Sequence, residues 1–360
     1  PRLAECDAII VCVPTPVGRH LEPDLSYVLD TARAIGRTLR KGQLISLEST
    51  TYPRTTRDDF LPALLETASE SLECGQDFFV AFSPEREDPG RKTHNTKSIP
   101  KLVGGLDDKS TQLATKLYAA GVAKVIPVGS AEIAESAKIL ENVFRAVNIA
   151  MVNELKVLFD RMDIDVWEVI EAAATKPFGF MPFYPGPGLG GHCIPIDPFY
   201  LTWKAKEYGL PTRFIELAGE VNHRMPEYVV HKCADALNGR SKSIRGSRVL
   251  IIGMAYKPNV DDTRETPAVE IAEQLMDLGA EVTYHDPHVA KIKGLRKYPG
   301  LEMQSVDLTD ATLAGTDLVL IATDHDAVDW NLIGQKASLV VDTRNAMTRA
   351  SNVNATVVKA

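Results

Sequence analysis

A glycine-rich stretch that ends in a cysteine, residues 185–193, is the clearest candidate for chemistry in this chain of 360 residues. Glycines let the backbone turn through positive φ and come close to a ligand. The stretch contains Gly186, Gly188, Gly190 and Gly191. Beyond it, Asp197 and Pro198 are typical of a helix N-cap and first turn, for a helix over residues 199–208 that stops at Gly209.

Cys193 therefore precedes a predicted helix N-terminus, where free amide N–H groups favour thiolate over thiol. A thiolate is a nucleophile that can attack a carbonyl carbon. The other interpretation is a structural loop with a buried, inert cysteine. The spacing alone fits both interpretations.

A second polar pair, Lys138 and Asn142, lies within the longest helical pattern, residues 130–162. At a spacing of four residues the two side chains share one face of a helix. The pair is either part of a solvated surface or a device that holds a substrate oxygen, and spacing does not decide between them.

His285, Asp286 and His288 resemble a metal cluster, but no further ligand is suggested, so a strand end followed by a turn is the favoured interpretation. The cysteines are odd in number and form no C-x-x-C motif, which predicts a reducing compartment and no zinc site. They are Cys6, Cys12, Cys74, Cys193 and Cys233.

The net charge of −8 argues against broad binding to nucleic acid or to an anionic membrane. It leaves room for an anionic ligand in a local basic pocket. No apolar run approaches the roughly 18 residues of a membrane span, and the start of the chain lacks a signal-peptide pattern, so we expect a cytoplasmic protein.

Short apolar runs alternate with helical patterns over residues 1–129, which predicts a doubly wound α/β domain. Residues 130–240 are predicted to be all-α. Residues 241–360 predict a second α/β sheet domain after a polar linker at 238–245.

One feature of a dinucleotide-binding sheet is missing, because no G-x-G-x-x-G occurs near the N-terminus. One interpretation is that the chain begins part-way through such a sheet, so that the first domain is truncated. The alternative is a domain that never bound a dinucleotide. The turn after residues 248–252 has a single glycine, Gly253, and gives only a weak signal for a second dinucleotide site.

With these motifs the whole chain resembles the UDP-glucose/GDP-mannose dehydrogenase family. Separated motifs occur in the order found in that family. They are Val13-Pro-Thr-Pro16, Glu48-Ser-Thr50, Ser83-Pro-Glu85, Lys138-x-x-x-Asn142, Gly190-Gly-His-Cys193-x-x-x-Asp197, and Lys257 with Asp262-Thr-Arg264. The resemblance implies two Rossmann-like domains joined by a central helical domain, and a homodimer or larger homo-oligomer built on the long helix.

The resemblance implies two successive NAD⁺-dependent oxidations, from alcohol to aldehyde to carboxylate. Cys193 would trap the aldehyde as a thiohemiacetal and then carry a thioester. Lys138 would stabilise negative charge on the C6 oxygen, and Asn142 would orient that oxygen. Asp197 would handle a proton together with a water molecule, and could serve as the helix cap as well.

The same resemblance assigns the remaining contacts. Glu85 would position substrate or water, and Thr50 would lie near water and the nicotinamide. The expected cofactor contacts are Val13, Pro14, Thr15, Thr50, Glu85 and Arg264. The expected substrate contacts are Glu85, Arg86, Lys138, Asn142, Tyr184, Pro185, Gly186, Gly188, Gly190, Lys257 and Arg344. Without the phosphate-binding glycines we expect weak or no NAD⁺ binding, and an inactive fragment.

Departures from the glucose and mannose branches favour the branch that oxidises UDP-N-acetylhexosamines for surface polysaccharides. His192 precedes the cysteine, and Ile196 stands where those branches have lysine. The motifs are nearer to the gluco than to the manno epimer. The alternatives are the UDP-N-acetylmannosamine or UDP-glucose activity, or a nucleotide-sugar-binding protein without catalysis.

Overall fold

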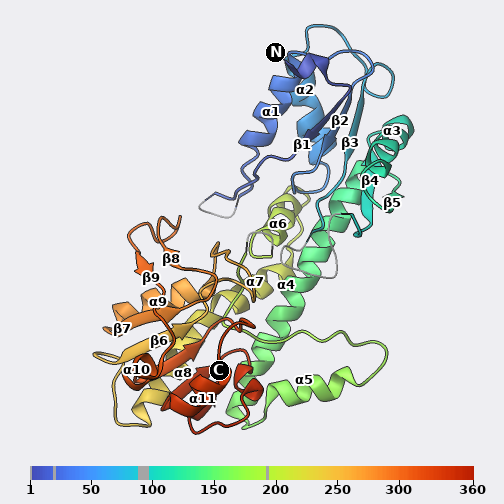
Figure 1. Ribbon diagram of the computed structural model, residues 1–360. Coiled ribbons are helices and arrows are strands. Elements are labelled where there is room, and N and C mark those ends of the chain that lie inside the picture. The colour runs from blue at the N-terminus through green and yellow to red at the C-terminus, as the bar shows by residue number, and fades with distance from the viewer. Residues whose placement is uncertain (1, 19–21, 88–96, 192–193) are drawn as a thin grey trace. The chain divides into compact units, whose positions relative to one another are not determined.

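A computed structural model describes residues 2–18, 22–87, 97–191 and 194–360 (Figure 1). The chain divides into two compact units. Unit 1 comprises Pro1–Phe144 with Ile196–Ile215, and unit 2 comprises Arg145–Pro195 with Glu216–Ala360. Each unit contains a sheet with helices on it, and the division falls within the long helix α4 (Ala131–Arg161).

The sheet of unit 1 has the strand order β1-β2-β3-β4-β5. The strands are β1 (Ala8–Val11), β2 (Leu44–Leu47), β3 (Phe79–Phe82), β4 (Lys101–Gly105) and β5 (Val125–Pro127). All neighbouring pairs are parallel except β3 and β4, which are antiparallel. The predicted alternation of strands and helices is confirmed, but this reversal was not foreseen.

Apolar side chains explain the layers of unit 1. Helices α1 (Ser26–Gly36) and α2 (Leu61–Glu66) pack on one face of the sheet, over the buried side chains of β1, β2 and β3. The short helix η2 (Thr56–Phe60) leads directly into α2. Helix α3 (Asp108–Ala119) packs on the other face, where Ala114 and Tyr118 contact buried residues of the strands.

A helical region lies between the two sheets in sequence, as predicted. It contains α4 and then α5 (Val166–Ala174), α6 (Asp197–Glu207), α7 (Arg213–His223) and α8 (Met225–Asn238). Helix α5 is capped by Asp165, whose side chain accepts the N–H of Trp167. The α6 cap was predicted wrongly.

Asp197 is the first residue of α6, and the N-cap is Ile196 with no side-chain hydrogen bond. The Asp197 carboxylate instead accepts a hydrogen bond from Asn142 at 2.5 Å, so it is turned toward α4. The predicted end of the helix is confirmed, since Gly209 has φ of 68° directly after the C-cap residue Tyr208.

The sheet of unit 2 has the order β12-β11-β10-β6-β7 and is parallel throughout. Its strands are β6 (Arg248–Ile252), β7 (Glu281–His285), β10 (Leu318–Ile321), β11 (Leu339–Asp342) and β12 (Thr356–Lys359). Helices α8 and α9 (Pro267–Asp277) cover one face, and α10 (Asp310–Ala314) and α11 (Trp330–Lys336) cover the other. A small two-stranded sheet joins β8 (Lys291–Ile292) to β9 (Met303–Gln304), and short 3-10 helices are η1 (Arg2–Glu5) and η3 (Ala346–Arg349).

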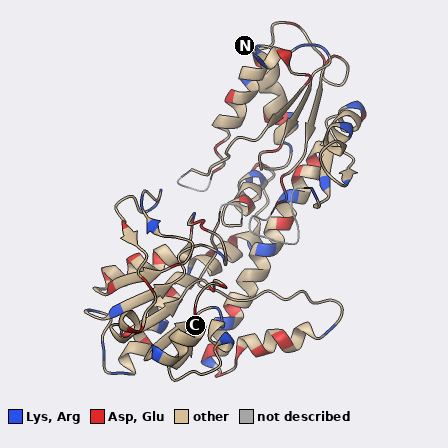
Figure 2. Ribbon diagram, in the orientation of Figure 1, with Lys and Arg blue, Asp and Glu red and all other residues tan. Residues whose placement is uncertain are grey.

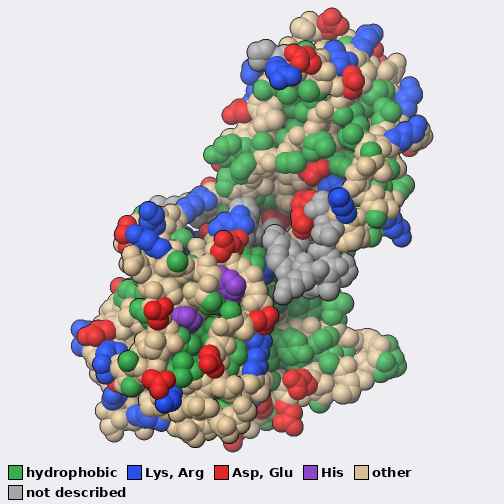
Figure 3. Space-filling view, in the orientation of Figure 1, with side chains coloured by type: hydrophobic (Ala, Val, Ile, Leu, Met, Phe, Trp, Pro, Cys, Tyr) green, Lys and Arg blue, Asp and Glu red, His purple; other side chains and the backbone are tan. Residues whose placement is uncertain are grey.

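Helix α4 exposes an apolar stripe. The residues are Ile133, Leu140, Phe144, Met151 and Leu158. Steps of four and seven residues keep all of them on one side of a helix. Hydrophobic side chains also gather around helix α5, as Figure 3 shows. Exposed apolar patches of this kind are typical of surfaces that bind another protein surface.

Charges of both signs alternate over both units, as seen in Figure 2. Within the described part of the chain no helix is long and apolar enough to cross a membrane.

Candidate functional site

Two loops at the carboxyl ends of β1 and β2 are tied together. The Ser49 hydroxyl accepts the N–H of Val13 at 2.9 Å and donates to its carbonyl at 2.7 Å. The Thr15 hydroxyl donates to the carbonyl of Thr50 at 2.8 Å. Because ligands of open α/β sheets bind at the carboxyl ends of the strands, the predicted residues Val13, Thr15 and Thr50 are gathered where a cofactor binds. Pro14, between them, is exposed.

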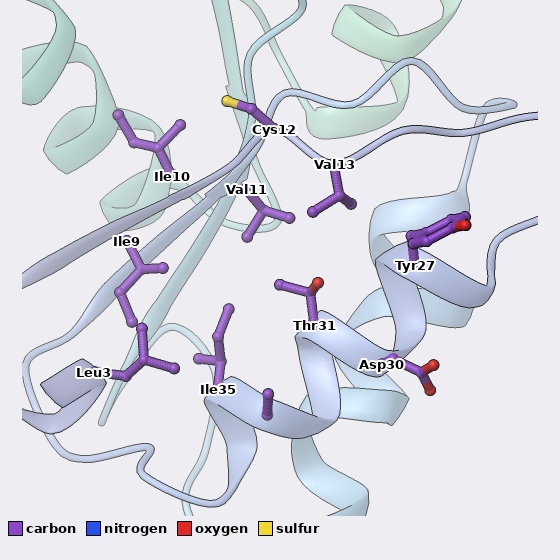
Figure 4. Close-up of a pocket in the computed structure, with 11 residues that line it drawn as sticks. Leu3, Ile9, Ile10, Val11, Cys12, Val13, Tyr27, Asp30, Thr31 and Ile35 are labelled. Carbon is purple, nitrogen blue, oxygen red and sulfur yellow. The ribbon is translucent and has the colours of Figure 1, made fainter. Parts of the chain in front are cut away.

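Two further features lie near these loops. The hydroxyl of Thr51 is buried and has no hydrogen-bond partner among the described residues, so it has a free position for a ligand atom. An apolar groove of about 430 Å³ lies between β1 and α1, beside Val13 (Figure 4). Ile9 and Val11 face Thr31 and Ile35 across it.

The loop after β3 carries Glu85 and Arg86. Glu85 accepts the backbone N–H groups of Arg86 and Glu87 at 2.7 and 2.6 Å, and its carboxylate is half exposed. Arg86 forms an ion pair with Glu141 of α4 at 2.7 Å and donates to the carbonyl of Pro100. The loop is thereby fastened to α4 on the turn that lies between Lys138 and Asn142.

The predicted pair on α4 is buried and not part of a solvated surface. Asn142 is fully buried and Lys138 is 7% exposed. Asn142 donates to Asp197, which is also buried. The Lys138 ammonium has no hydrogen bond or ion pair to any residue that the structure describes. The ammonium is therefore available to bind an oxygen atom of a ligand.

Glu135, one turn before Lys138 on α4, was not predicted from the sequence as a functional residue. Its carboxylate is completely buried. It accepts the N–H of Arg54 at 2.6 Å, the N–H of Thr56 at 2.9 Å and the hydroxyl of Thr56 at 2.6 Å. Burial raises its pKa to about 7, although these hydrogen bonds oppose the shift. Its place three residues before Lys138 was the available signal.

In unit 2 the glycine-rich loop is anchored to α4. The N–H of Gly186 donates to Asn153 at 3.0 Å, and Asn153 donates to Asn222 at 2.9 Å. Asn153 is another residue that the sequence did not mark. A Cβ on Gly186 would lie 2.5 Å from Nη1 of Arg344, so the predicted loop and the predicted arginine are in contact. Pro185, beside them, is buried.

The glycines serve close packing more than unusual backbone angles. Positive φ occurs at Gly188 and Gly191 but not at Gly186 or Gly190, which corrects the expectation for those two. A Cβ on Gly190 would lie 2.5 Å from Cβ of Tyr256. The ring of Tyr256 lies under Gly191 in the same way, at 2.9 Å from a Cβ placed there.

The remaining predicted contacts in unit 2 lie in the same region. Lys257 lies over the ring of Tyr256, with Nζ 5.6 Å from the ring centroid. Arg264 accepts the N–H of Gly191 with its carbonyl, and its guanidinium binds Asp262. Tyr184 stacks on Trp167 with 5.5 Å between ring centroids.

The histidine cluster is structural among the described residues, where no metal-binding group of side chains is found. Asp286 accepts the N–H groups of Met254 and Ala255 at 2.7 and 3.0 Å and bonds buried His325. Burial alone would raise the pKa of Asp286, but the hydrogen bond and charge of His325 lower it. The N–H groups that hold phosphate in a dinucleotide site are thus occupied by a carboxylate of the chain itself.

Cys193 and His192 lie outside the described residues. Of the other cysteines, Cys6 and Cys12 are exposed, Cys74 is half-buried and Cys233 is buried. Burial raises the pKa of Cys12, and the carboxylate of Glu48 adds to the shift, which disfavours its thiolate.

The structure combines a sheet of the type that binds a dinucleotide with a long helix that carries a buried lysine and asparagine. A second sheet domain places an arginine against the glycine-rich loop. This combination is typical of dehydrogenases with two Rossmann-like domains. Models of the UDP-glucose/GDP-mannose dehydrogenase family match its NAD binding domain at residues 1–122, its central domain at 132–224 and its UDP binding domain at 250–349. The chain belongs to this family, and NAD is its cofactor.

Individual relatives agree with this assignment. The chain is 39% identical over 300 residues to UDP-N-acetyl-D-glucosamine 6-dehydrogenase of Pseudomonas aeruginosa, covering 82% of this chain and 69% of that protein. It is 35% identical over 345 residues to UDP-N-acetyl-D-mannosamine dehydrogenase of Pyrococcus horikoshii, covering 94% and 77%. The structure of UDP-D-ManNAc dehydrogenase from Pyrococcus horikoshii superposes with a TM-score of 0.86 at 32% identity, over 98% of this chain and 80% of that one.

These matches correct the expectation about the first domain. The NAD binding domain is matched from residue 1 to 122, so the inference that its N-terminal part is absent is not supported. The expectations of a truncated fold and of an inactive fragment depended on that inference and are likewise not supported. Weak NAD⁺ binding stays a prediction.

Proposed function

We propose that the protein oxidises the C6 hydroxyl of a UDP-N-acetylhexosamine, UDP-N-acetylglucosamine, to the uronic acid. The family assignment supports oxidation of a nucleotide sugar, and the relatives named for N-acetylated sugars support the sugar class. The product is an acidic nucleotide sugar suited to surface polysaccharides. A cytoplasmic location, where thiols stay reduced, fits the cysteine chemistry.

Lys138 carries the proposal, because this largely buried lysine beside Asn142 has no hydrogen bond or ion pair to a described residue. In the first step the C6 hydroxyl loses its proton through water to Asp197, and Lys138 stabilises the negative charge on the oxygen. Bound NAD⁺ would supply the acceptor for the hydride from C6. Val13, Thr15, Thr50 and the Thr51 hydroxyl would hold the nicotinamide end.

In the second step the sulfur of Cys193 forms a bond to the aldehyde carbon, and the aldehyde oxygen becomes a hydroxyl. The thiohemiacetal then loses a hydride from C6 and its hydroxyl proton, and a thioester remains. A second NAD⁺ would supply the acceptor for that hydride. Water then attacks the thioester carbon, and the C–S bond breaks to give the carboxylate and free thiol. Glu85 would position that water.

In unit 2, Lys257 and Arg344 are proposed to bind the diphosphate, since cations in these places suit an anionic ligand. The loop from Tyr184 to Gly190 would cradle the sugar nucleotide. Arg86 and Arg264 are proposed contacts to substrate and cofactor, respectively.

An NADH-release assay with the full-length protein and each UDP-sugar tests the substrate. We expect turnover of UDP-N-acetylglucosamine with two NADH per sugar. Turnover of UDP-N-acetylmannosamine or UDP-glucose alone would overturn the choice of sugar. Cys193→Ser is expected to abolish acid formation, and unchanged acid formation in that variant would exclude the thioester route.

A further inference from the structure

Glu135 is an anchor between α4 and the segment that follows β2. Its two carboxylate oxygens accept three hydrogen bonds from Arg54 and Thr56 at 2.6 to 2.9 Å, all at a position shielded from solvent. Two of the donors are backbone N–H groups at the start of the η2–α2 helix, where the helix dipole favours a carboxylate. The segment is thus held by its main chain and not by a flexible side chain.

The segment needs such an anchor because its backbone is strained. Arg54 has φ of 81°, a left-handed value that costs a non-glycine residue free energy. Thr50 and Thr51, which lie four and three residues before it, are the residues proposed to face the nicotinamide. A turn that relaxed at Arg54 would move both.

The anchor belongs to a closed path of polar contacts within unit 1. The Thr15 hydroxyl bonds the carbonyl of Thr50, and the Tyr200 hydroxyl on α6 bonds the carbonyl of Thr15. Asp197, three residues before Tyr200, accepts from Asn142, which returns the path to α4. The loops proposed to bind the cofactor are therefore connected to α4 at two places, through Glu135 and through Asn142.

We propose that Glu135 is a positioning residue for dehydrogenation, which holds the Thr50–Thr51 segment in register with Lys138 and Asn142. It touches neither substrate nor cofactor and acts through the backbone of residues 54–56. This inference depends on the family's reaction, but not on which sugar is oxidised.

If Glu135 only stabilised the fold, its loss would not lower kcat more than the loss of another contact between the same two elements. A residue on the same helix provides that comparison. Glu132 lies one turn before Glu135 and pairs with the side chain of Arg57 at 2.5 Å. It joins α4 to the same η2–α2 segment without touching the strained turn. Glu132→Gln therefore removes a connection between the two elements, whereas Glu135→Gln places an NH₂ group against the N–H of Arg54.

The test measures kcat and KM for NAD⁺ and for the UDP-sugar in the full-length protein, together with amide hydrogen exchange of residues 50–56 without ligands. For Glu135→Gln we expect kcat to fall roughly tenfold or more. Exchange in the segment is expected to become faster, and KM for the UDP-sugar to stay within about twofold. Glu132→Gln is expected to change kcat less than about twofold.

Faster exchange in Glu135→Gln with unchanged kcat would overturn the positioning role, as would equal losses in both variants. If Glu135→Gln does not fold, Thr56→Val removes one of the three bonds and is expected to give an intermediate loss of kcat; an unchanged kcat would overturn the inference. A wild-type protein inactive on every UDP-sugar would overturn the proposed function, and exchange would still decide whether Glu135 holds the segment.

Discussion

At the scale of single residues, Lys138 and Lys156 form a natural comparison. Both are buried lysines on α4. Lys156 donates to the carbonyl of Lys359 at 3.2 Å and lies 3.6 Å from Asp160, whereas Lys138 has no described partner. Burial lowers the pKa of Lys156, so Asp160 and the Lys359 carbonyl only partly compensate its charge, whereas the ammonium of Lys138 is available to a ligand.

Lys138→Met is expected to lower kcat roughly 10²–10³-fold, because the negative charge that develops on the C6 oxygen loses its cation. Lys156→Met on the same helix is the control. Asp160 keeps its ion pair with Lys232 in this variant, so kcat is expected to change less than about twofold. NADH release measures both effects, and an unchanged kcat in Lys138→Met would contradict the proposed role of Lys138.

Glu135 predicts a pH dependence of stability. Burial raises its pKa from 4.5 to about 7, and Glu132 adds to the increase. On the facing segment, Arg54 pairs with Asp58, Arg57 pairs with Glu132, and Asp59 accepts the hydroxyl of Tyr52. The folded state thus binds a proton more tightly than the unfolded state, and this contribution is lost as pH rises from about 4.5 through about 7.

The loss is about 3 kcal/mol at 1.36 kcal/mol per pKa unit. Urea unfolding at pH 5 and pH 8 should show it as a difference between the wild type and Glu135→Gln, in which all other titrating groups cancel. Equal pH dependence in the two proteins would mean that Glu135 titrates normally.

At the scale of elements, periodicity predicted the strands, the long helix and the end of α6. The predictions were wrong where a polar side chain binds a partner that is far away in the sequence. Asp197 fits an N-cap by local chemistry, but Asn142, 55 residues earlier, binds its carboxylate. Likewise, nothing local marks β4 as antiparallel to β3, because strand direction depends on how the chain returns to the sheet.

The glycine loop was located from sequence, but the reason for its glycines was only partly foreseen, because contacts with Tyr256 and Arg344 come from residues far along the chain. Lys138 and Asn142 on α4 were identified from the sequence. Glu135 and Asn153 were not, because their hydrogen-bond partners lie far from them in the sequence and are known only from the fold.

Gly190→Ala tests the packing role of the loop. Its Cβ would be 2.5 Å from Cβ of Tyr256, so the loop must shift, at a cost of roughly 1–3 kcal/mol in unfolding free energy and with loss of kcat. Gly209→Ala is the control, because Gly209 has positive φ but open space around it. We expect it to cost about 1 kcal/mol without change in kcat, as urea unfolding and NADH release would show.

At the scale of the whole molecule, α4 is organised in an unusual way. The face that carries Glu135, Lys138 and Asn142 is polar and buried, while the exposed stripe from Ile133 to Leu158 is apolar. A stripe of this kind on a soluble surface is stabilised when it packs against another apolar surface. Its period of seven residues suits a second helix with the same pattern, so we expect α4 of one subunit to contact α4 of another.

Leu140→Asp and Leu158→Asp, combined in one protein, are expected to convert a dimer or larger oligomer into a monomer, because two carboxylates in a paired apolar stripe lose their solvation. Gln112→Asp and Lys116→Asp on exposed positions of α3 form the matched control, which also adds two carboxylates but lies outside the stripe. Light scattering after size-exclusion chromatography measures the mass over a range of concentrations. A wild-type protein that is monomeric throughout would remove the pairing role of α4, whereas dissociation in the control as well would assign the effect to charge and not to the stripe.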